Sequence, residues 1–116
     1  MTWQTILCTY QSPYVTITLN RVAQQNAIND QLMTELIQVI TELPEDITII
    51  ILQGQSGVFC TGMDFKHATS HWPNNRAEAE QFSKPYMQLL QCLASVPKVI
   101  VSAIDGKVMA GGVGLV

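Results

Sequence analysis

The amino-acid sequence predicts an α/β fold in which crossover helices connect neighbouring strands. Three observations support this prediction: alternating side chains at residues 15–19, a helical apolar pattern at 32–43, and two short apolar runs at 47–53 and 99–104. In order, the expected elements are β-β-α-β-α-β, followed by a helix that begins near Gly111. A chain of 116 residues has room for one domain at most.

The first two elements are expected to form an antiparallel hairpin. Residues 5–10 predict a short strand, and Ser12-Pro13 interrupts it. Residues 15–19 alternate apolar and hydroxyl side chains, which is typical of a strand with one buried face. Residues 20–27 show no period and are expected to form a loop.

A first helix is expected to begin after Asn29. The Asn29 side chain can cap the helix, and Asp30 suits the positive end of the helix dipole. Pro44 ends the helix, because the residue before a proline avoids the α region. The apolar residues recur at spacings of three and four and predict one buried stripe: Leu32, Met33, Leu36, Ile37, Ile40 and Leu43.

The later elements alternate between apolar strands and a second helix. The runs at 47–53 and 99–104 predict strands buried on both faces, as in a parallel sheet. Residues 58–60 predict a short additional strand. The second helix is expected from about Ser83 to Ala94, with Ser83 as its N-cap and Pro85 in its first turn.

Composition excludes several classes of function. Only 13% of the residues are charged, the formal net charge is −3, and the six basic residues are scattered. Nucleic acid is therefore not expected as a partner. The longest apolar stretch, 47–52, is too short to span a bilayer, and the N-terminus lacks a signal-peptide pattern. The widely spaced cysteines form no disulfide or metal pattern and predict a cytoplasmic protein with reduced thiols: Cys8, Cys60 and Cys92.

Two glycine-containing segments are the candidates for chemistry. Residues 59–65 (FCTGMDF) and 105–114 (DGKVMAGGVG) each follow a predicted strand. Ligands of parallel sheets bind at the carboxyl ends of the strands. A helix that begins near Gly111 would point free N–H groups at this edge, where they would stabilise an oxyanion such as an enolate.

These segments give the chain a resemblance to a known family. Residues 17–21 and 26–29, residues 49–54, the segment 59–65 and the pair Gly111-Gly112 together resemble the enoyl-CoA hydratase/isomerase (crotonase) family, in the same order and spacing. The resemblance implies a crotonase-like spiral of ββα units. It also implies that residues 1–116 are the N-terminal part of a single crotonase-like domain, incomplete because its C-terminal helices are absent. The full-length protein would be a homotrimer.

The resemblance also implies the site. The backbone N–H groups of Met63 and Gly111 would form the oxyanion hole that holds the thioester carbonyl. The neighbouring residues would bind the substrate: Gly62, Asp64, Phe65 and Gly112. No metal and no cofactor is implied, because the substrate arrives as a coenzyme A or phosphopantetheine thioester.

One departure from the family narrows the expected reaction. Hydratases place a catalytic glutamate three residues after the oxyanion-hole glycine, where this chain has Gly114. The second acidic residue of the family would lie beyond Val116. The chain looks most like the dehydratases of polyketide β-branching cassettes, which lack the first glutamate. These enzymes dehydrate a 3-hydroxy-3-methylglutaryl group on an acyl-carrier protein, so the expected partner is a carrier protein or a coenzyme A thioester.

Several alternatives stay open at this point. On the same scaffold the protein could be an enoyl-CoA hydratase, an isomerase or a decarboxylase, or the chain could be an inactive truncated fragment or a partner-binding module. Asp64 is more simply a helix cap than an acid or base. His67 and His71 have metal-site spacing but no third ligand, and Cys60 is interpreted as a small buried residue. The polar residues 66–81 are either a flap over the acyl pocket or a plain surface loop.

Overall fold

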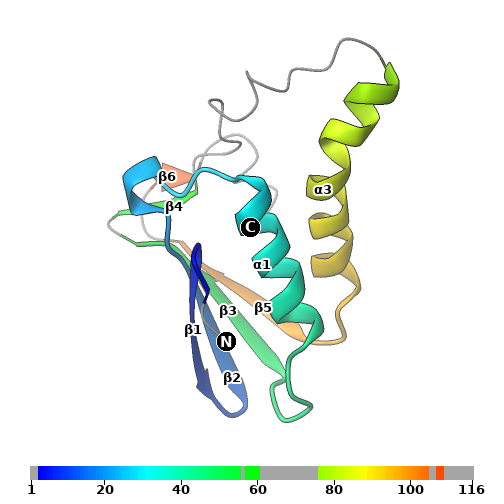
Figure 1. Ribbon diagram of the computed structural model, residues 1–116. Coiled ribbons are helices and arrows are strands. Elements are labelled where there is room, and N and C mark those ends of the chain that lie inside the picture. The colour runs from blue at the N-terminus through cyan, green and yellow to red at the C-terminus, as the bar shows by residue number, and fades with distance from the viewer. Residues whose placement is uncertain (1–2, 56, 61–75, 105–106, 109–116) are drawn as a thin grey trace.

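Two helices cover one face of a four-stranded sheet, and a smaller two-stranded sheet lies at one end (Figure 1). The computed structural model describes residues 3–55, 57–60, 76–104 and 107–108. The order of elements confirms the α/β prediction and adds a short last strand. The elements are β1 Ile6–Gln11, β2 Tyr14–Leu19, the 3-10 helix η1 Val22–Gln24, α1 Asp30–Thr41, β3 Ile49–Gln53, β4 Val58–Cys60, α3 Arg76–Ser95, β5 Val99–Ala103 and β6 Lys107–Val108.

The strands of the large sheet run in the order β1-β2-β3-β5. β1 and β2 form the expected antiparallel hairpin, whereas β3 pairs with β2 and β5 in parallel. β4 and β6 pair in parallel to form the second sheet. The chain thus contains two ββα units, β1-β2-α1 and β3-β4-α3, followed by the strand pair β5-β6. Each of the strand pairs β3-β4 and β5-β6 contributes one strand to the large sheet and one to the small sheet.

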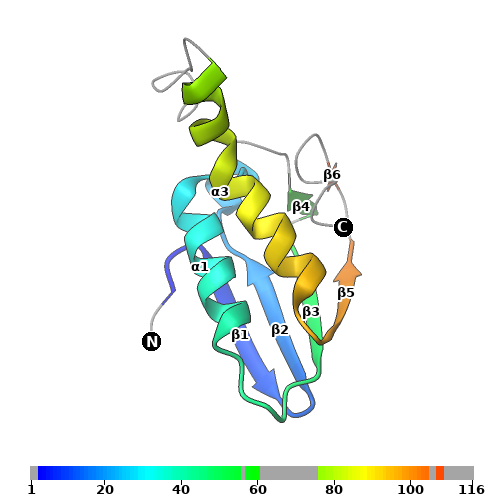
Figure 2. The ribbon, with the colours of Figure 1, turned by 90° about the vertical axis from the view of Figure 1, so that its right-hand side faces the viewer.

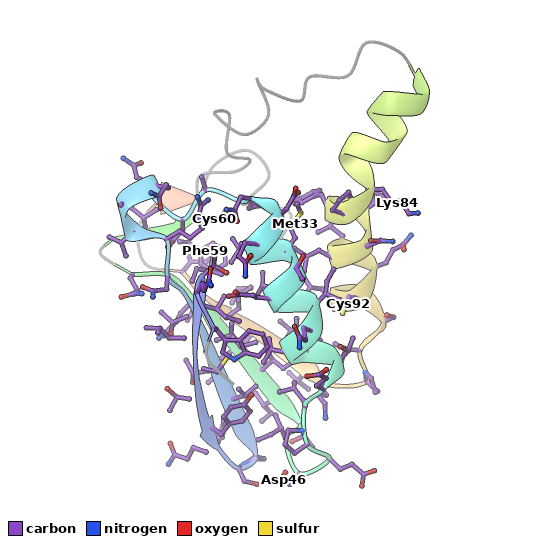
Figure 3. All side chains as sticks on the ribbon, viewed as in Figure 1. Met33, Asp46, Phe59, Cys60, Lys84 and Cys92 are labelled. Atoms are coloured by element: carbon purple, nitrogen blue, oxygen red, sulfur yellow. The ribbon has the colours of Figure 1, made fainter. Side chains whose placement is uncertain are left out.

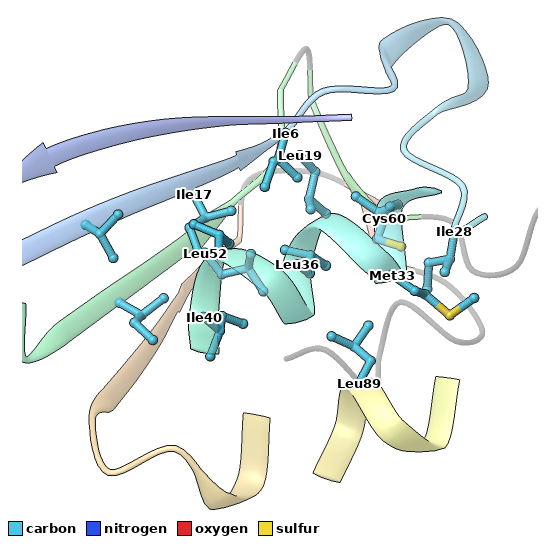
Figure 4. Packing of buried hydrophobic residues seen from close by; sticks show 14 of the residues in the cluster. Ile6, Ile17, Leu19, Ile28, Met33, Leu36, Ile40, Leu52, Cys60 and Leu89 are labelled. Atoms are coloured by element: carbon cyan, nitrogen blue, oxygen red, sulfur yellow. The ribbon is translucent and has the colours of Figure 1, made fainter. Parts of the chain in front are cut away.

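The core lies between the large sheet and α1. In β2, Val15, Ile17 and Leu19 are buried and the intervening threonines are half-buried, as the alternating pattern predicts. Figure 4 shows side chains of the sheet and of α1 in this cluster, with Leu89 of α3 on its other side. This arrangement fixes the distance between the helix layer and the sheet.

The first helix confirms its predicted cap. The Asn29 Oδ1 accepts a hydrogen bond from the Leu32 N–H at 2.9 Å, and Asp30 occupies the first turn. The helix ends at Thr41, before Pro44. Most of the predicted stripe is buried, whereas Ile37 and Leu43 lie half-buried at its margin. The loop expected at 20–27 contains the short helix η1.

The prediction of strands buried on both faces is wrong for the described part of the chain. In β3, Ile50 and Leu52 are buried, but the residues between them are only partly so. In β5, Val99 is 60% exposed and Val101 is 46% exposed. Both helices pack on the same face of the sheet, so the opposite face has no cover from the described residues (Figure 2).

The second helix is longer than predicted. It begins at Arg76 instead of Ser83, and Pro85 lies inside it. Residues 76–82 are mostly good helix formers, and their propensity extends the helix on the N-terminal side of the proline. The part of the predicted flap or loop at 76–81 is therefore helical. Its remainder, 66–75, lies outside the described residues. None of the described helices is long and apolar enough to cross a membrane.

A buried carboxylate ties the start of the chain to α1. Glu35 is only 4% exposed, and it accepts hydrogen bonds from the backbone N–H groups of Gln4 and Thr5, from the Thr5 hydroxyl at 2.8 Å, and from the Gln31 amide at 2.5 Å. Burial alone would raise the pKa of Glu35, but these hydrogen bonds outweigh burial and hold the pKa below its ordinary value of 4.5. Burial, and to a smaller extent the Glu35 charge, raises the pKa of the Cys8 thiol to about 11.

The Glu35→Gln variant tests this tie. It is expected to lower the free energy of unfolding at neutral pH by about 1–3 kcal/mol, because the new NH2 group would face backbone donors. The folded-state pKa lies below the unfolded one, so the stabilisation is present above pH 4.5 and is lost as the pH falls through the folded pKa. Urea denaturation at neutral pH and at about pH 3 measures the loss of stability and its dependence on pH.

The matched control is Glu45→Gln, which changes an exposed glutamate in the turn after α1. Its effect should stay within about 0.5 kcal/mol. A Glu35→Gln protein that is as stable as the wild type at neutral pH would contradict the role assigned to this carboxylate.

Candidate active site

The carboxyl ends of the parallel strands define the edge where a site is expected. β2, β3 and β5 run in the same direction, so Leu19, Gln53 and Ala103 end at one edge of the large sheet. β4 follows β3 at this edge. Figure 3 shows Phe59 and Cys60 at the same end of the molecule as Met33, which lies near the start of α1, and Asp46 at the opposite end. The start of α1 therefore lies at the same end of the molecule as β4.

The second sheet brings the two glycine-containing segments together. β4 pairs with β6 in parallel, with Cys60 opposite Val108. Met63 lies three residues after Cys60, and Gly111 lies three residues after Val108. Because β4 and β6 are parallel, two segments far apart in the sequence leave the sheet from adjacent positions and in the same direction. Three residues span at most about 11 Å. The predicted site residues themselves lie outside the described residues: Gly62, Met63, Asp64, Phe65, Gly111 and Gly112.

The strand that leads to the first segment is buried. Phe59 and Cys60 are both fully buried in the core, which confirms the interpretation of Cys60 as a small buried residue. Within the described ranges, none of the cysteines forms a disulfide. Tyr86 of α3 lies near this strand, and its pKa is raised, first by burial and second by the charge that a Cys60 thiolate would carry. The only signal for Tyr86 in the sequence is its position within a predicted helix, which does not indicate a functional residue.

A buried amide connects the loop before α1 to β4. Asn26 is fully buried, and its Nδ2 donates to the carbonyl oxygens of Val58 at 3.2 Å and Phe59 at 3.1 Å. Its Oδ1 accepts from the Arg21 N–H at 2.8 Å. The Arg21 side chain in turn donates to the Ala27 carbonyl. In the sequence, Asn26 stands out only as part of the segment 26–29.

The turn between β3 and β4 is also tightly fitted. A Cβ atom on Gly54 would lie 2.0 Å from the Val58 carbonyl oxygen, so no other residue fits unless β4 moves. The Gln55 side chain donates to the Leu19 carbonyl at 3.2 Å and to the Asn20 Oδ1 at 2.8 Å. These contacts join the end of β2 to the turn, so β4 is positioned relative to the large sheet.

A cavity of about 320 Å³ lies at the other end of the molecule. Its lining comes from the last turns of α1 and α3 and from the residues that follow them: Ile40, Thr41, Leu43, Cys92, Ser95, Val96, Pro97 and Lys98. It lies near the amino ends of β3 and β5, away from the two candidate segments. Within the described ranges, no three His, Cys, Asp or Glu side chains gather as a metal site. His67, His71 and Gly114 lie outside those ranges.

Comparison with known proteins identifies the family. The sequence profile described as enoyl-CoA hydratase/isomerase matches residues 10–116. The chain belongs to this family. It is 35% identical over its whole length to bacillaene synthase dehydratase PksH of Bacillus subtilis, and it covers 45% of that protein. It is also 31% identical over 83% of its length to enoyl-CoA hydratase EchA19 of Mycobacterium tuberculosis, of which it covers 37%.

A solved structure supports the same assignment. The crystal structure of the Bacillus subtilis protein, described as a polyketide biosynthesis enoyl-CoA hydratase, matches 97% of this chain with a TM-score of 0.82 and 32% identity. The crotonase fold expected from the resemblance is therefore confirmed for the two ββα units. The chain spans less than half the length of these relatives of the enoyl-CoA hydratase/isomerase family.

The Cys60→Ala variant tests the structural role of this thiol. We expect the free energy of unfolding to fall by about 1–2 kcal/mol, because a buried sulfur is lost from the core. Any acyl-thioester activity of the protein should be retained, since Cys60 is not expected to be a nucleophile. Thermal unfolding and steady-state kinetics measure the two effects, with Cys8→Ala as the control at a half-buried cysteine on β1. Loss of activity without loss of stability would assign Cys60 a chemical role.

Proposed function

We propose that this protein dehydrates a β-hydroxy acyl thioester in polyketide biosynthesis. The parallel pairing of Cys60 with Val108 carries the proposal, because it starts the two oxyanion-hole segments from neighbouring positions. The 35% identity to the bacillaene synthase dehydratase supports dehydration as the reaction. We propose the 3-hydroxy-3-methylglutaryl group on an acyl-carrier protein as the substrate.

The backbone N–H groups of Met63 and Gly111 are the proposed oxyanion hole. Both would donate to the thioester carbonyl oxygen, and the charge on this oxygen grows as the enolate forms. Donors fixed by the fold need no reorganisation during the reaction, so they stabilise the transition state more than the ground state. The proposed contacts to the rest of the acyl group and to its carrier are made by neighbouring residues: Gly62, Asp64, Phe65 and Gly112.

The proposed reaction is an elimination of water from the β-hydroxy acyl thioester. A base takes the proton from the α carbon, and the electron pair of that C–H bond moves into the carbonyl to give the enolate. The enolate then returns the pair to form the Cα=Cβ double bond, the bond from Cβ to the hydroxyl oxygen breaks, and an acid supplies the proton that completes water. The thioester needs no redox cofactor for these steps.

The proposal extends to the assembly in which the reaction takes place. A carrier protein or coenzyme A would deliver the thioester, and a homotrimer in the cytoplasm is the proposed form of the full-length enzyme. Hydration of an enoyl-CoA is the second candidate, favoured by the similarity to enoyl-CoA hydratase EchA19. Gly114 favours the first candidate, because the polyketide dehydratases that the chain resembles also lack the glutamate that hydratases place at this position.

A substrate comparison tests the proposed function. The natural full-length protein is given 3-hydroxy-3-methylglutaryl thioesters on a carrier protein and on coenzyme A, and also an unbranched enoyl-CoA. Mass spectrometry follows the loss or gain of one water. We expect loss of water from the carrier-bound branched substrate to have the highest kcat/KM. Faster hydration of the unbranched enoyl-CoA would replace the proposal with the second candidate.

Replacing the Met63 peptide N–H by an ester oxygen tests the proposed oxyanion hole. Incorporation of the α-hydroxy analogue of methionine keeps the side chain and removes only the donor. We expect kcat to fall by about 10²–10³, as for removal of one oxyanion-hole donor, with a smaller change in KM. Thermal unfolding checks that the ester protein is folded. An unchanged kcat in a folded ester protein would exclude Met63 from the oxyanion hole.

A further inference from the structure

The buried side-chain amide of Asn26 makes hydrogen bonds that reach beyond its own loop. Its oxygen accepts from Arg21 N–H within its own loop, whereas both of its described donor contacts go to β4, more than thirty residues later in the chain. We propose that Asn26 is a positioning residue for the reaction. It fixes the end of β4 and so the direction in which the chain leaves the strand. This inference rests on the function proposed above.

The orientation of the amide is determined by its neighbours. The Arg21 N–H can only donate, so the atom that faces it at 2.8 Å is the Asn26 oxygen. The Val58 and Phe59 carbonyls can only accept, so the NH2 group faces them. Asn26 also has a positive φ of 56°, a conformation that asparagine tolerates better than most residues. Both the side chain and the backbone conformation therefore favour asparagine at this position.

The two carbonyls that Asn26 binds belong to consecutive residues. In a regular strand, successive carbonyl groups point to opposite sides, so one NH2 group would not reach both. The pairing of β4 with β6 shifts register between Val58 and Cys60, which is the irregularity that such a contact requires. Irregularities of this kind redirect the chain and are frequent beside active sites. Asn26 thus binds β4 at its irregular part, next to the last described residue, Cys60.

Gly54 packs against the same two residues. A Cβ atom on Gly54 would lie 2.0 Å from the Val58 oxygen and 2.6 Å from the Phe59 Cα. The Val58 oxygen also accepts from the Gln55 N–H at 3.0 Å. The backbone of Val58 and Phe59 is therefore held by hydrogen bonds from Asn26 and Gln55 and by close packing on Gly54. This arrangement uses only backbone atoms of β4, so it does not depend on the side chains of that strand.

The position of Phe59 limits where a later donor can lie. Met63 follows Phe59 by four residues, which span at most about 14 Å. A displacement of about 1 Å in a catalytic group can lower a rate by about 10²-fold. A change at Asn26 is therefore expected to reduce kcat through the N–H group of Met63, although Asn26 makes no contact with the reacting atoms.

The test uses two variants that release or push β4 in the natural full-length protein. Asn26→Gly removes the amide but tolerates the positive φ, and Gly54→Ala forces a Cβ against Val58. The matched control is Asn29→Ala, which removes the cap of α1 and thus a polar contact of similar size that does not involve β4. Thermal unfolding shows the folded fraction of each protein, and kinetics are compared at temperatures where all three are folded.

Two readouts separate positioning from stability. One is kcat for dehydration, expected to fall about 10²-fold in Asn26→Gly and Gly54→Ala with a smaller change in KM. The other is the infrared carbonyl stretch of a bound, unreactive thioester, which an oxyanion hole moves to lower frequency. Both variants should lose part of this shift. The Asn29→Ala protein should melt at a lower temperature but keep kcat and the shifted carbonyl.

Three results would overturn the proposal. The first is a folded Asn26→Gly protein with the kcat and carbonyl frequency of the wild type. The second is an equal loss of kcat in Asn29→Ala, which would mean that lowered stability alone explains the effect. The third is a wild-type protein that neither dehydrates nor shifts the thioester carbonyl. Only this third result would also overturn the proposed function.

Discussion

The packing of α1 against β1, β2 and β3 is the contact on which the remaining structure depends. The stripe that includes Leu32, Leu36 and Ile40 fills the face formed by alternate residues of the sheet, and α3 packs against the same layer. Because helices connect the parallel strands, their carboxyl ends all reach one edge. The apolar core thus determines where a site can form, whereas its details depend on polar contacts at that edge.

The strands that precede the two candidate segments form a small second sheet. β4 has three residues and β6 has two, and the register shifts between them. Their placement relative to the large sheet depends on Gly54, on the Gln55 amide and on Asn26. Stability and positioning are therefore divided between different groups of residues: apolar side chains hold the layers together, and buried amides orient the strand that precedes the proposed oxyanion hole.

Local patterns were sufficient to predict much of the fold. The alternation in β2 and the spacing and cap of α1 predicted those elements because each depends on neighbours close in sequence. Burial of β3 and β5 on both faces was predicted wrongly, because an apolar run does not reveal how many layers cover it. The start of α3 was misplaced because Pro85 suits a first turn and also fits inside this longer helix. Glu35 and Asn26 could not be found from spacing, since their partners lie about thirty residues away.

The proposed oxyanion hole is tested most directly by a crystal structure of the natural full-length protein with a bound, unreactive acyl thioester. We expect the thioester oxygen to lie about 2.7–3.1 Å from both the Met63 and the Gly111 backbone nitrogens. We also expect the Asn26 amide to bind the Val58 and Phe59 carbonyls in that complex. A thioester oxygen that contacts neither nitrogen, or a thioester bound at the opposite end of the sheet, would contradict the proposed site.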